Sequence, residues 1–412
     1  MTDTTEAAAA TDPRRRLSEI EFIALVAMLT ATVAFSIDAM LPALPQIGAE
    51  LSPAVPNRAQ LILSAFIAGM GLGTLVTGPM SDRFGRKPVI LGGALLYIAG
   101  ALLAWMAPTL ETMLAARLIQ GLGAAAPRVA AMAMVRDLYS GRQMARTLSF
   151  VMMIFALVPA IAPTLGYGII ATVGWRGIFP AFVVFALLGA AWLALRQPET
   201  LPQASRRRYS PADIAAALRE MWAHPTARLA TIVQTIVLGM LFATLQTTQL
   251  AFDQTYGRGD SFHLWFGLIA VLAASSSFVN ARYVVRLGMR AMIKGMFTAQ
   301  IAFSATMIAV LALPLPQAVE FPLYVIWTVS LFFQAGLCIG NLNALALEPM
   351  GHVAGLAATV VSSVGTLGAV AIAVPVGLAF DGTPLPHALA SLALAALALW
   401  LTTKIRRDTD PD

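Results

Sequence analysis

Apolar runs of about 20 residues recur along the whole of this 412-residue chain, and each is long enough to cross a lipid bilayer as a helix. The composition agrees, because 58% of the residues are hydrophobic and only 12% are charged. Every backbone polar group in lipid must be paired within the chain, so runs of this length predict an all-α integral membrane protein. The twelve predicted transmembrane helices are 20–45, 58–80, 88–107, 110–134, 145–172, 175–196, 228–250, 262–285, 290–313, 321–344, 352–378 and 386–405.

Lys and Arg are unevenly distributed among the predicted loops. When the loops are numbered from a cytoplasmic N-terminus, most of the 27 Lys and Arg residues fall on the inner side, and the outer loops hold only Arg58, Arg176 and Arg258. This is the positive-inside pattern of a multi-pass membrane protein, here with both termini in the cytoplasm. The formal net charge of +6 therefore reports topology, and we expect no nucleic-acid partner.

The longest polar stretch inside the chain, 197–227, separates six predicted helices from six others. We therefore predict an N-terminal six-helix bundle over 17–196, a cytoplasmic linker, and a C-terminal six-helix bundle over 228–405. The segments 1–16 and 406–412 are predicted to be cytoplasmic tails. Two six-helix repeats around a site near the middle of the membrane are a common design of secondary transporters.

The segment 78–88, between the second and third predicted helices, gathers charge into a tight turn and reads GPMSDRFGRKP. Its second glycine tolerates a positive φ that other residues resist. A looser form of the pattern, 280–290, stands at the matching place in the second half. The string resembles the signature loop of the major facilitator superfamily, G-x-x-x-D-R-x-G-R-K/R. The resemblance implies a latch that holds the two halves together on the cytoplasmic side through charge pairs of Asp82 with Arg83 or Arg86. Its residues are Gly78, Asp82, Arg83, Gly85, Arg86 and Lys87.

Charged side chains are rare inside the predicted helices, and each costs roughly 2.5–3.5 kcal/mol to insert even on the mildest scale. Asp38 in the first helix and Arg117 in the fourth each stand about seven residues from the outer end, hence at similar depth. We interpret them as the proton-coupling pair, because a carboxylate whose pairing changes can take a proton from one side and release it to the other. The alternatives are a static ion pair between Asp38 and Arg117, or a structural role for Asp38 at the end of the helix before Pro42.

Arg128 follows Arg117 by eleven residues, about three helical turns, so both face nearly the same side, with Gln120 close to that face. This polar stripe indicates either a water-filled cavity or a contact with a neighbouring helix. Arg128 is also near enough to the cytoplasmic end for its head group to reach the membrane surface.

The fifth predicted helix contains Pro159 and Pro163, followed by Gly166 and Tyr167. Prolines remove backbone donors and bend a helix, and small residues permit close approach of a neighbour. The string resembles the antiporter motif of drug–proton exchangers, G-x-x-x-G-P-x-x-G-G, with Tyr167 in place of the last glycine. We expect Tyr167 to narrow a contact between helices 2 and 5 or to offer its ring to the substrate. A structural proline kink is the alternative.

Further strings identify one branch of the superfamily when they are taken together. They are DAMLPALP at 38–45, RLIQGLG at 117–123, VRDLY at 135–139, WRGIF at 175–179, NAR at 280–282 and EPMGHVAG at 348–355. In this order they resemble the bicyclomycin/chloramphenicol-resistance (Bcr/CflA) type of twelve-helix drug–proton antiporter. The resemblance implies export of small amphipathic antibiotics by alternating access, in a bacterial inner membrane.

An apolar pocket with a few polar groups is typical of small-molecule sites, and 19 Met residues suit an adaptable one. The candidate cavity residues are Met40, Gln120, Arg128, Gln246, Gln249, Gln334 and Asn341. The alternative is that the amides hold helices together.

Patterns typical of enzymes are missing from the sequence. Cys338 is the only cysteine, and the four histidines form no metal-binding string. With no glycine-rich nucleotide cradle, we predict a monomeric transporter without cofactor, driven by the proton gradient, and not an enzyme. A dedicated exporter of one metabolite, such as an amino acid, a polyamine or a self-made antibiotic, is the alternative to a drug exporter.

Overall fold

The computed structural model describes residues 17–207 and 209–405. Within these ranges the secondary structure is helical throughout, with no β-strand. The predicted tails 1–16 and 406–412 lie outside the described residues.

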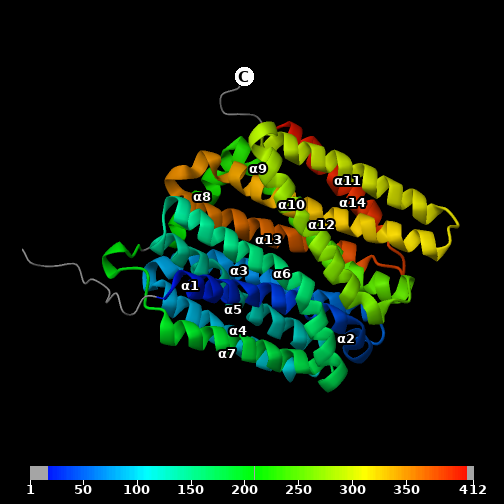
Figure 1. The fold of residues 1–412 in the computed structure, drawn as a ribbon, viewed down its shortest axis with the longest axis horizontal. Coiled ribbons are helices and arrows are strands. Elements are labelled where there is room, and N and C mark those ends of the chain that lie inside the picture. The colour runs from blue at the N-terminus through cyan, green and yellow to red at the C-terminus, as the bar shows by residue number, and fades with distance from the viewer. Residues whose placement is uncertain (1–16, 208, 406–412) are drawn as a thin grey trace, which may run out of the picture.

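The first half of the chain forms one bundle, which occupies the lower part of Figure 1. Its long helices are α1 (Glu19–Asp38), α3 (Leu61–Phe84), α4 (Arg86–Trp105), α5 (Leu110–Leu138), α6 (Gly141–Val173) and α7 (Ile178–Arg196). The short helix α2 (Leu44–Leu51) continues α1 beyond a break and lies at the end of the bundle opposite α8.

The second half forms the other bundle. Its long helices are α9 (Pro225–Leu250), α10 (Phe262–Leu287), α11 (Met289–Ala312), α12 (Gln317–Leu347), α13 (Ala354–Leu378) and α14 (Leu385–Thr403). Between the bundles the linker carries α8 (Pro211–Ala223), in which Ser210 and Asp213 cap the first turn reciprocally. Hydrogen bonds from the Ser210 amide and hydroxyl hold the pKa of Asp213 below its usual value.

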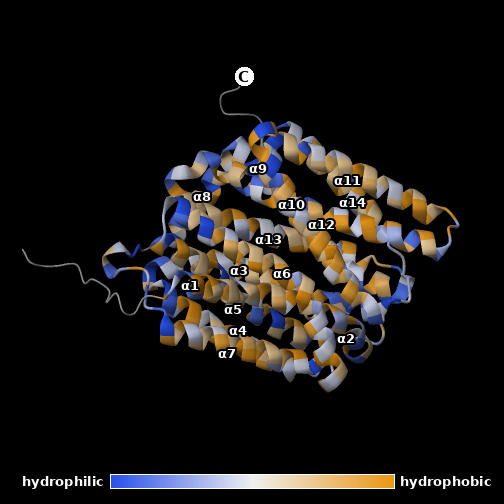
Figure 2. Cartoon of the chain, in the orientation of Figure 1, coloured by the Kyte–Doolittle hydropathy of each residue, from blue (hydrophilic) through white to orange (hydrophobic). Residues whose placement is uncertain are grey.

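The prediction of twelve membrane-crossing helices is confirmed. Among the described residues, eleven segments are long and apolar enough to span a bilayer, and one of them, Gln317–Leu378, contains both α12 and α13. These two helices are separated at Glu348–Val353, where Met350 leaves helical geometry. Apolar residues dominate the middle of the long helices and polar residues gather toward the ends of the bundle, as Figure 2 shows.

The two halves repeat one structural device at matching places. Gly85 ends α3 with φ +103°, and Gly288 ends α10 with φ +82°. In each case the next helix starts at the following residue, so one residue turns the chain through a conformation that favours glycine. This equivalence supports the internal repeat expected from the two signature strings.

The halves meet along α3 with α13 and along α6 with α10. Near the outer ends, Gln60 Nε2 donates to the carbonyl of Gly377 at 2.6 Å, and Asn57 Nδ2 donates to that of Phe380 at 2.6 Å. Gln246 Nε2 donates to Ser64 Oγ at 3.0 Å at the same end. These bonds close the outer side of the interface.

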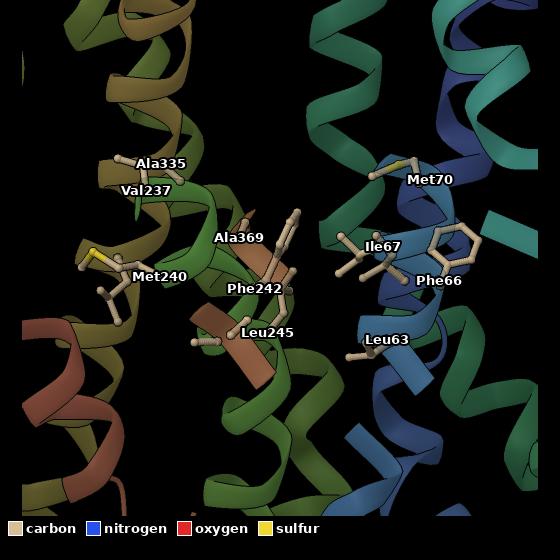
Figure 3. Close-up of a cluster of buried hydrophobic side chains, with 14 of the residues drawn as sticks. Leu63, Phe66, Ile67, Met70, Val237, Met240, Phe242, Leu245, Ala335 and Ala369 are labelled. Atoms are coloured by element: carbon tan, nitrogen blue, oxygen red, sulfur yellow. The ribbon is translucent and has the colours of Figure 1, made fainter. Parts of the chain in front are cut away.

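Apolar side chains from both halves face one another below this closure. Figure 3 shows Ile67 and Met70 of α3 on one side and Phe242 of α9 on the other. The two bundles are thus joined at the outer end, with apolar surface between them further inward.

Candidate functional site

A cavity of about 440 Å³ lies between the two halves, within the size range of small-molecule sites. Its walls come from α1, α3, α5 and α6 of the first half and α9, α10, α12 and α13 of the second. Four phenylalanines supply most of the aromatic surface: Phe155, Phe242, Phe266 and Phe332. The polar remainder is small and includes Gln234, Ser276 and Thr366.

Asp38 and Arg128 are the ionisable residues of this lining. Asp38 is the last residue of α1 and is 5% exposed. The helix ends there because Pro42 has no N–H to donate to the Asp38 carbonyl. Within the described part of the chain, Asp38 has neither an ion pair nor a side-chain hydrogen bond, so its carboxylate is available to a ligand or a proton.

Arg117 does not pair with Asp38, which corrects the predicted ion pair. Its side chain is fully buried; Nη1 donates to Gln120 Oε1 at 2.7 Å and Nη2 donates to the Ser36 carbonyl at 3.0 Å. The guanidinium also lies 4.4 Å from the centre of the Phe66 ring, a favourable cation–π distance. Arg117 is therefore next to the end of α1 without lining the cavity.

The break at the end of α1 explains how Arg117 reaches the backbone. The Met40 amide donates to Ile37, three residues back, and not to Ser36, so the Ser36 carbonyl has room to accept from Arg117. The Ser36 hydroxyl donates to Thr32 and contacts the Tyr97 hydroxyl at 2.6 Å. One buried polar network thus fixes the turn that carries Asp38.

Arg128 faces the cavity, not the membrane surface. Its side chain is exposed and lines the cavity. The hydrogen bond described for its guanidinium runs from Nη1 to Met70 Sδ at 3.5 Å, and a thioether is a weak acceptor.

The other six predicted cavity residues do not line the cavity. Met40 is buried beyond the end of α1, and the Gln120 side chain accepts a hydrogen bond from Arg117. Gln246 belongs to the outer closure, and Gln249 is buried one turn further out. Gln334 donates to Met240, and Asn341 donates to Asn280 at 2.7 Å. For Gln120, Gln246, Gln334 and Asn341, the alternative interpretation as links between side chains fits better.

The proline-rich helix α6 packs against α1 and α10 rather than α3, which corrects the expected contact between helices 2 and 5. Pro159 lines the cavity, and Pro163 is buried. A Cβ on Gly166 would collide with the Ala39 carbonyl directly after Asp38. Glycine here permits close approach of α6 to the Asp38 turn.

Tyr167 points away from the cavity. Its ring stacks on His263 of α10, with 4.2 Å between ring centres and an angle of 13°. It therefore joins the two halves near their outer ends and offers no surface to a ligand in the cavity.

The loop between α3 and α4 is held mainly within the first half. Arg86 forms ion pairs with Asp82 and with Asp137 of α5, the latter at 3.0 Å. The Glu199 carboxylate accepts from the amides of Arg86 and Lys87 at 2.9 and 3.0 Å, where a carboxylate complements the helix N-terminus.

The charge pair expected of Asp82 with Arg83 or Arg86 is found with Arg86, and the predicted latch needs correction in its contact with the second half. Arg83 is exposed and lies over the Phe84 ring, so Arg86 carries the charge pairs alone within the described residues. The contact with the second half is steric, because Gly78 leaves no room for a Cβ beside Thr359 of α13. The linker adds a bond from the Arg207 amide to the Asp82 carbonyl at 3.0 Å.

Asp137 and Glu199 were not predicted as site residues. Asp137 stands in the VRDLY string and Glu199 follows α7, but nothing in their spacing indicates that both converge on Arg86 and Lys87. Only the packing of α4 against α5 and α7 brings them together.

The comparisons with known proteins agree with this architecture. The model of the Major Facilitator Superfamily matches residues 26–373. The chain belongs to the major facilitator superfamily. It is 29% identical to a bicyclomycin resistance protein homolog of Haemophilus influenzae over 83% of this chain and 85% of that one. It is 28% identical to a chloramphenicol resistance protein of Pseudomonas aeruginosa over 85% and 84% of the two chains.

These relatives confirm the resemblance to the bicyclomycin/chloramphenicol-resistance branch. Among solved structures, the human organic anion transporter MFSD10 matches with a TM-score of 0.70, covering 94% of this chain and all of that one, at 18% identity. A likeness at that identity supports the fold alone. The chain is thus a multi-pass membrane transporter of this superfamily.

Proposed function

We propose that the protein exports small amphipathic drugs, of the chloramphenicol or bicyclomycin kind, in exchange for protons. The relatives named for resistance to these antibiotics support the substrate class. The observation that carries the coupling is Asp38, a carboxylate without a protein partner among the described residues, in the wall of an otherwise largely apolar cavity.

In the proposed cycle a proton and the drug compete for Asp38. Ionised Asp38 attracts a cationic or hydrogen-bond-donating group of the drug from the cytoplasm, and protonation from outside removes that attraction. Arg117 acts as a positioning residue, because it holds the Ser36 carbonyl two residues before Asp38. A proton entering down 100 mV supplies roughly 2.3 kcal/mol, which corresponds to about a 50-fold gradient of a neutral drug.

The exchange of access requires the outer closure to open. In the proposed motion the bundles rock along α3 with α13 and along α6 with α10, breaking the bonds of Gln60, Asn57 and Gln246. The loop around Arg86 keeps α3, α4 and α5 together, so that the first half moves as a unit.

The protein works as a monomer in a bacterial inner membrane, uses no cofactor and catalyses no reaction. The energy comes from the proton gradient alone.

The test is drug-triggered proton movement in proteoliposomes, with a phenicol and bicyclomycin as substrates. Wild type should move protons on addition of a substrate, and Asp38→Asn should not. Asp381→Asn is the matched control, because Asp381 is an exposed outer carboxylate that bonds only within its own turn to Thr383. Coupling that persists in Asp38→Asn would move the proton site elsewhere. A wild type that responds to neither compound would favour a dedicated metabolite exporter.

A further inference from the structure

The cavity has an uneven distribution of charge. Both ionisable residues of its lining, Asp38 and Arg128, come from the first half of the chain. The second half contributes apolar residues and neutral polar groups such as Gln234, Ser277 and Ser362. The charge of the cavity wall is therefore confined to the first half, and the wall supplied by the second half is uncharged.

Arg128 has unused hydrogen-bonding capacity. A guanidinium has five N–H donors and is always charged, yet the described partner of Arg128 is one thioether at 3.5 Å. Placing a charged group inside the membrane costs free energy, so a charged residue at this depth usually has a function. The exposed guanidinium therefore needs an acceptor that the described part of the protein does not supply.

Asp38 and Arg128 do not neutralise each other, since no ion pair joins them among the described residues. The Arg117 guanidinium lies at Phe66 and that of Arg128 reaches Met70, one turn or about 6 Å further inward along α3. Asp38 follows Ser36, whose carbonyl binds Arg117, by two positions on α1, so it stands near the level of Arg117. The charge of Arg128 therefore lies roughly one helical turn, about 6 Å, inward of the level of Asp38.

We infer that Arg128 recognises an anionic group of the substrate, so that the transporter prefers amphipathic zwitterions. The acidic group lies at Arg128, the basic group lies at Asp38, and the aromatic body lies between the phenylalanines of the cavity. This inference rests on the proposed function and specifies its substrate class.

The sign of proton coupling selects the zwitterion over a simple anion. Protonation of Asp38 would remove a repulsion for an anion bound to Arg128, so the anion would bind more tightly on the outside, opposite to what export by antiport requires. When Asp38 is protonated, the ammonium group of a bound zwitterion loses its carboxylate partner, and the zwitterion is released. A simple cation would be released as well, but it leaves Arg128 unmatched and is repelled by it.

The test uses three compounds with one ring system. Norfloxacin carries both a carboxylate and an amine. Its methyl ester carries only the amine, and its N-acetyl derivative carries only the carboxylate. Binding to the purified, detergent-solubilised protein is measured at neutral pH. Wild type should bind norfloxacin roughly tenfold to a hundredfold more tightly than the ester, the range of one charge-assisted hydrogen-bonding interaction.

Arg128→Met should remove the preference for norfloxacin over the ester and leave binding of the ester unchanged or stronger. Arg128→Lys should keep most of that preference, and Arg136→Met, an exposed arginine further along α5, should keep all of it. Asp38→Asn should remove the preference for norfloxacin over the N-acetyl derivative.

A wild type that binds the ester as tightly as norfloxacin, or that binds neither, overturns the inference, as does an unchanged preference in Arg128→Met. If Arg128→Met binds none of the three compounds because it does not fold, Arg128→Lys decides, since loss of the preference there also overturns it. Proton movement with uncharged phenicols tests the proposed function separately, because it depends on Asp38 and not on the acidic group of the substrate.

Discussion

Replacing Arg86 by alanine should destabilise the protein far more than the same change at Arg83, although both are cations of one signature loop. The Arg86 side chain is 9% exposed and donates to Asp137 at 3.0 Å and to Ser81 at 2.8 Å, besides its ion pair with Asp82. The carboxylate of Asp137 is only 15% exposed. Removing one partner of a buried pair typically costs about 3–5 kcal/mol because the other charge is left buried.

The value expected for Arg86→Ala lies at the lower end, about 2–4 kcal/mol, since Asp82 is 31% exposed and can regain water. Arg83 is exposed and lies over the Phe84 ring, and surface changes of this kind stay within about 0.5 kcal/mol. Thermal unfolding in detergent should therefore show a melting temperature several degrees lower for Arg86→Ala and nearly unchanged for Arg83→Ala. Equal losses in the two variants would refute the role assigned to Arg86 and Asp137.

Three further changes test other parts of the account. Gly166→Leu should abolish transport while the protein still inserts, because the new Cβ collides with the Ala39 carbonyl and displaces the Asp38 turn; the readout is antibiotic accumulation in cells, and normal export would contradict it. Gln60→Ala removes one hydrogen bond to Gly377 of the outer closure, worth about 0.5–1.5 kcal/mol. The rate at which a thiol reagent added outside labels a cysteine placed in the cavity should therefore rise roughly twofold to tenfold. An unchanged rate would exclude Gln60 from the closure. Arg117→Met should slow proton-coupled transport at least tenfold. The melting temperature should change little, because relief of an insertion cost of roughly 2.5–3.5 kcal/mol offsets the lost hydrogen bonds of Arg117. A large loss of stability with normal coupling would make Arg117 purely structural.

The sequence is sufficient to predict the helices and their topology, because bilayer thickness and backbone pairing leave few alternatives. It also indicates which polar residues lie inside the membrane. It does not determine which of them face the cavity. Gln120 and Arg128 lie on one face of α5, but Gln120 is used by Arg117 and Arg128 is free to line the cavity.

Partners from distant segments were the least predictable part of the site. Asp38 and Arg117 stand at similar depth, yet depth does not specify direction, and Arg117 turns to the backbone of Ser36 instead. Similarly, Asp137 reaches Arg86 through the packing of α4 against α5. Helical periodicity fixes the face of a residue on its own helix, while its neighbour depends on how that helix is rotated within the bundle.

The central claim is that a proton and the drug exchange at the carboxylate of Asp38. The most direct measurement is proton release into weakly buffered detergent solution when the purified protein binds an antibiotic. The compound used is the one that binds most tightly among a phenicol, bicyclomycin and norfloxacin. Wild type, loaded with protons at mildly acidic pH, should release protons in proportion to the drug bound, and Asp38→Asn should bind drug without releasing any. Equal proton release from the two proteins would contradict the account.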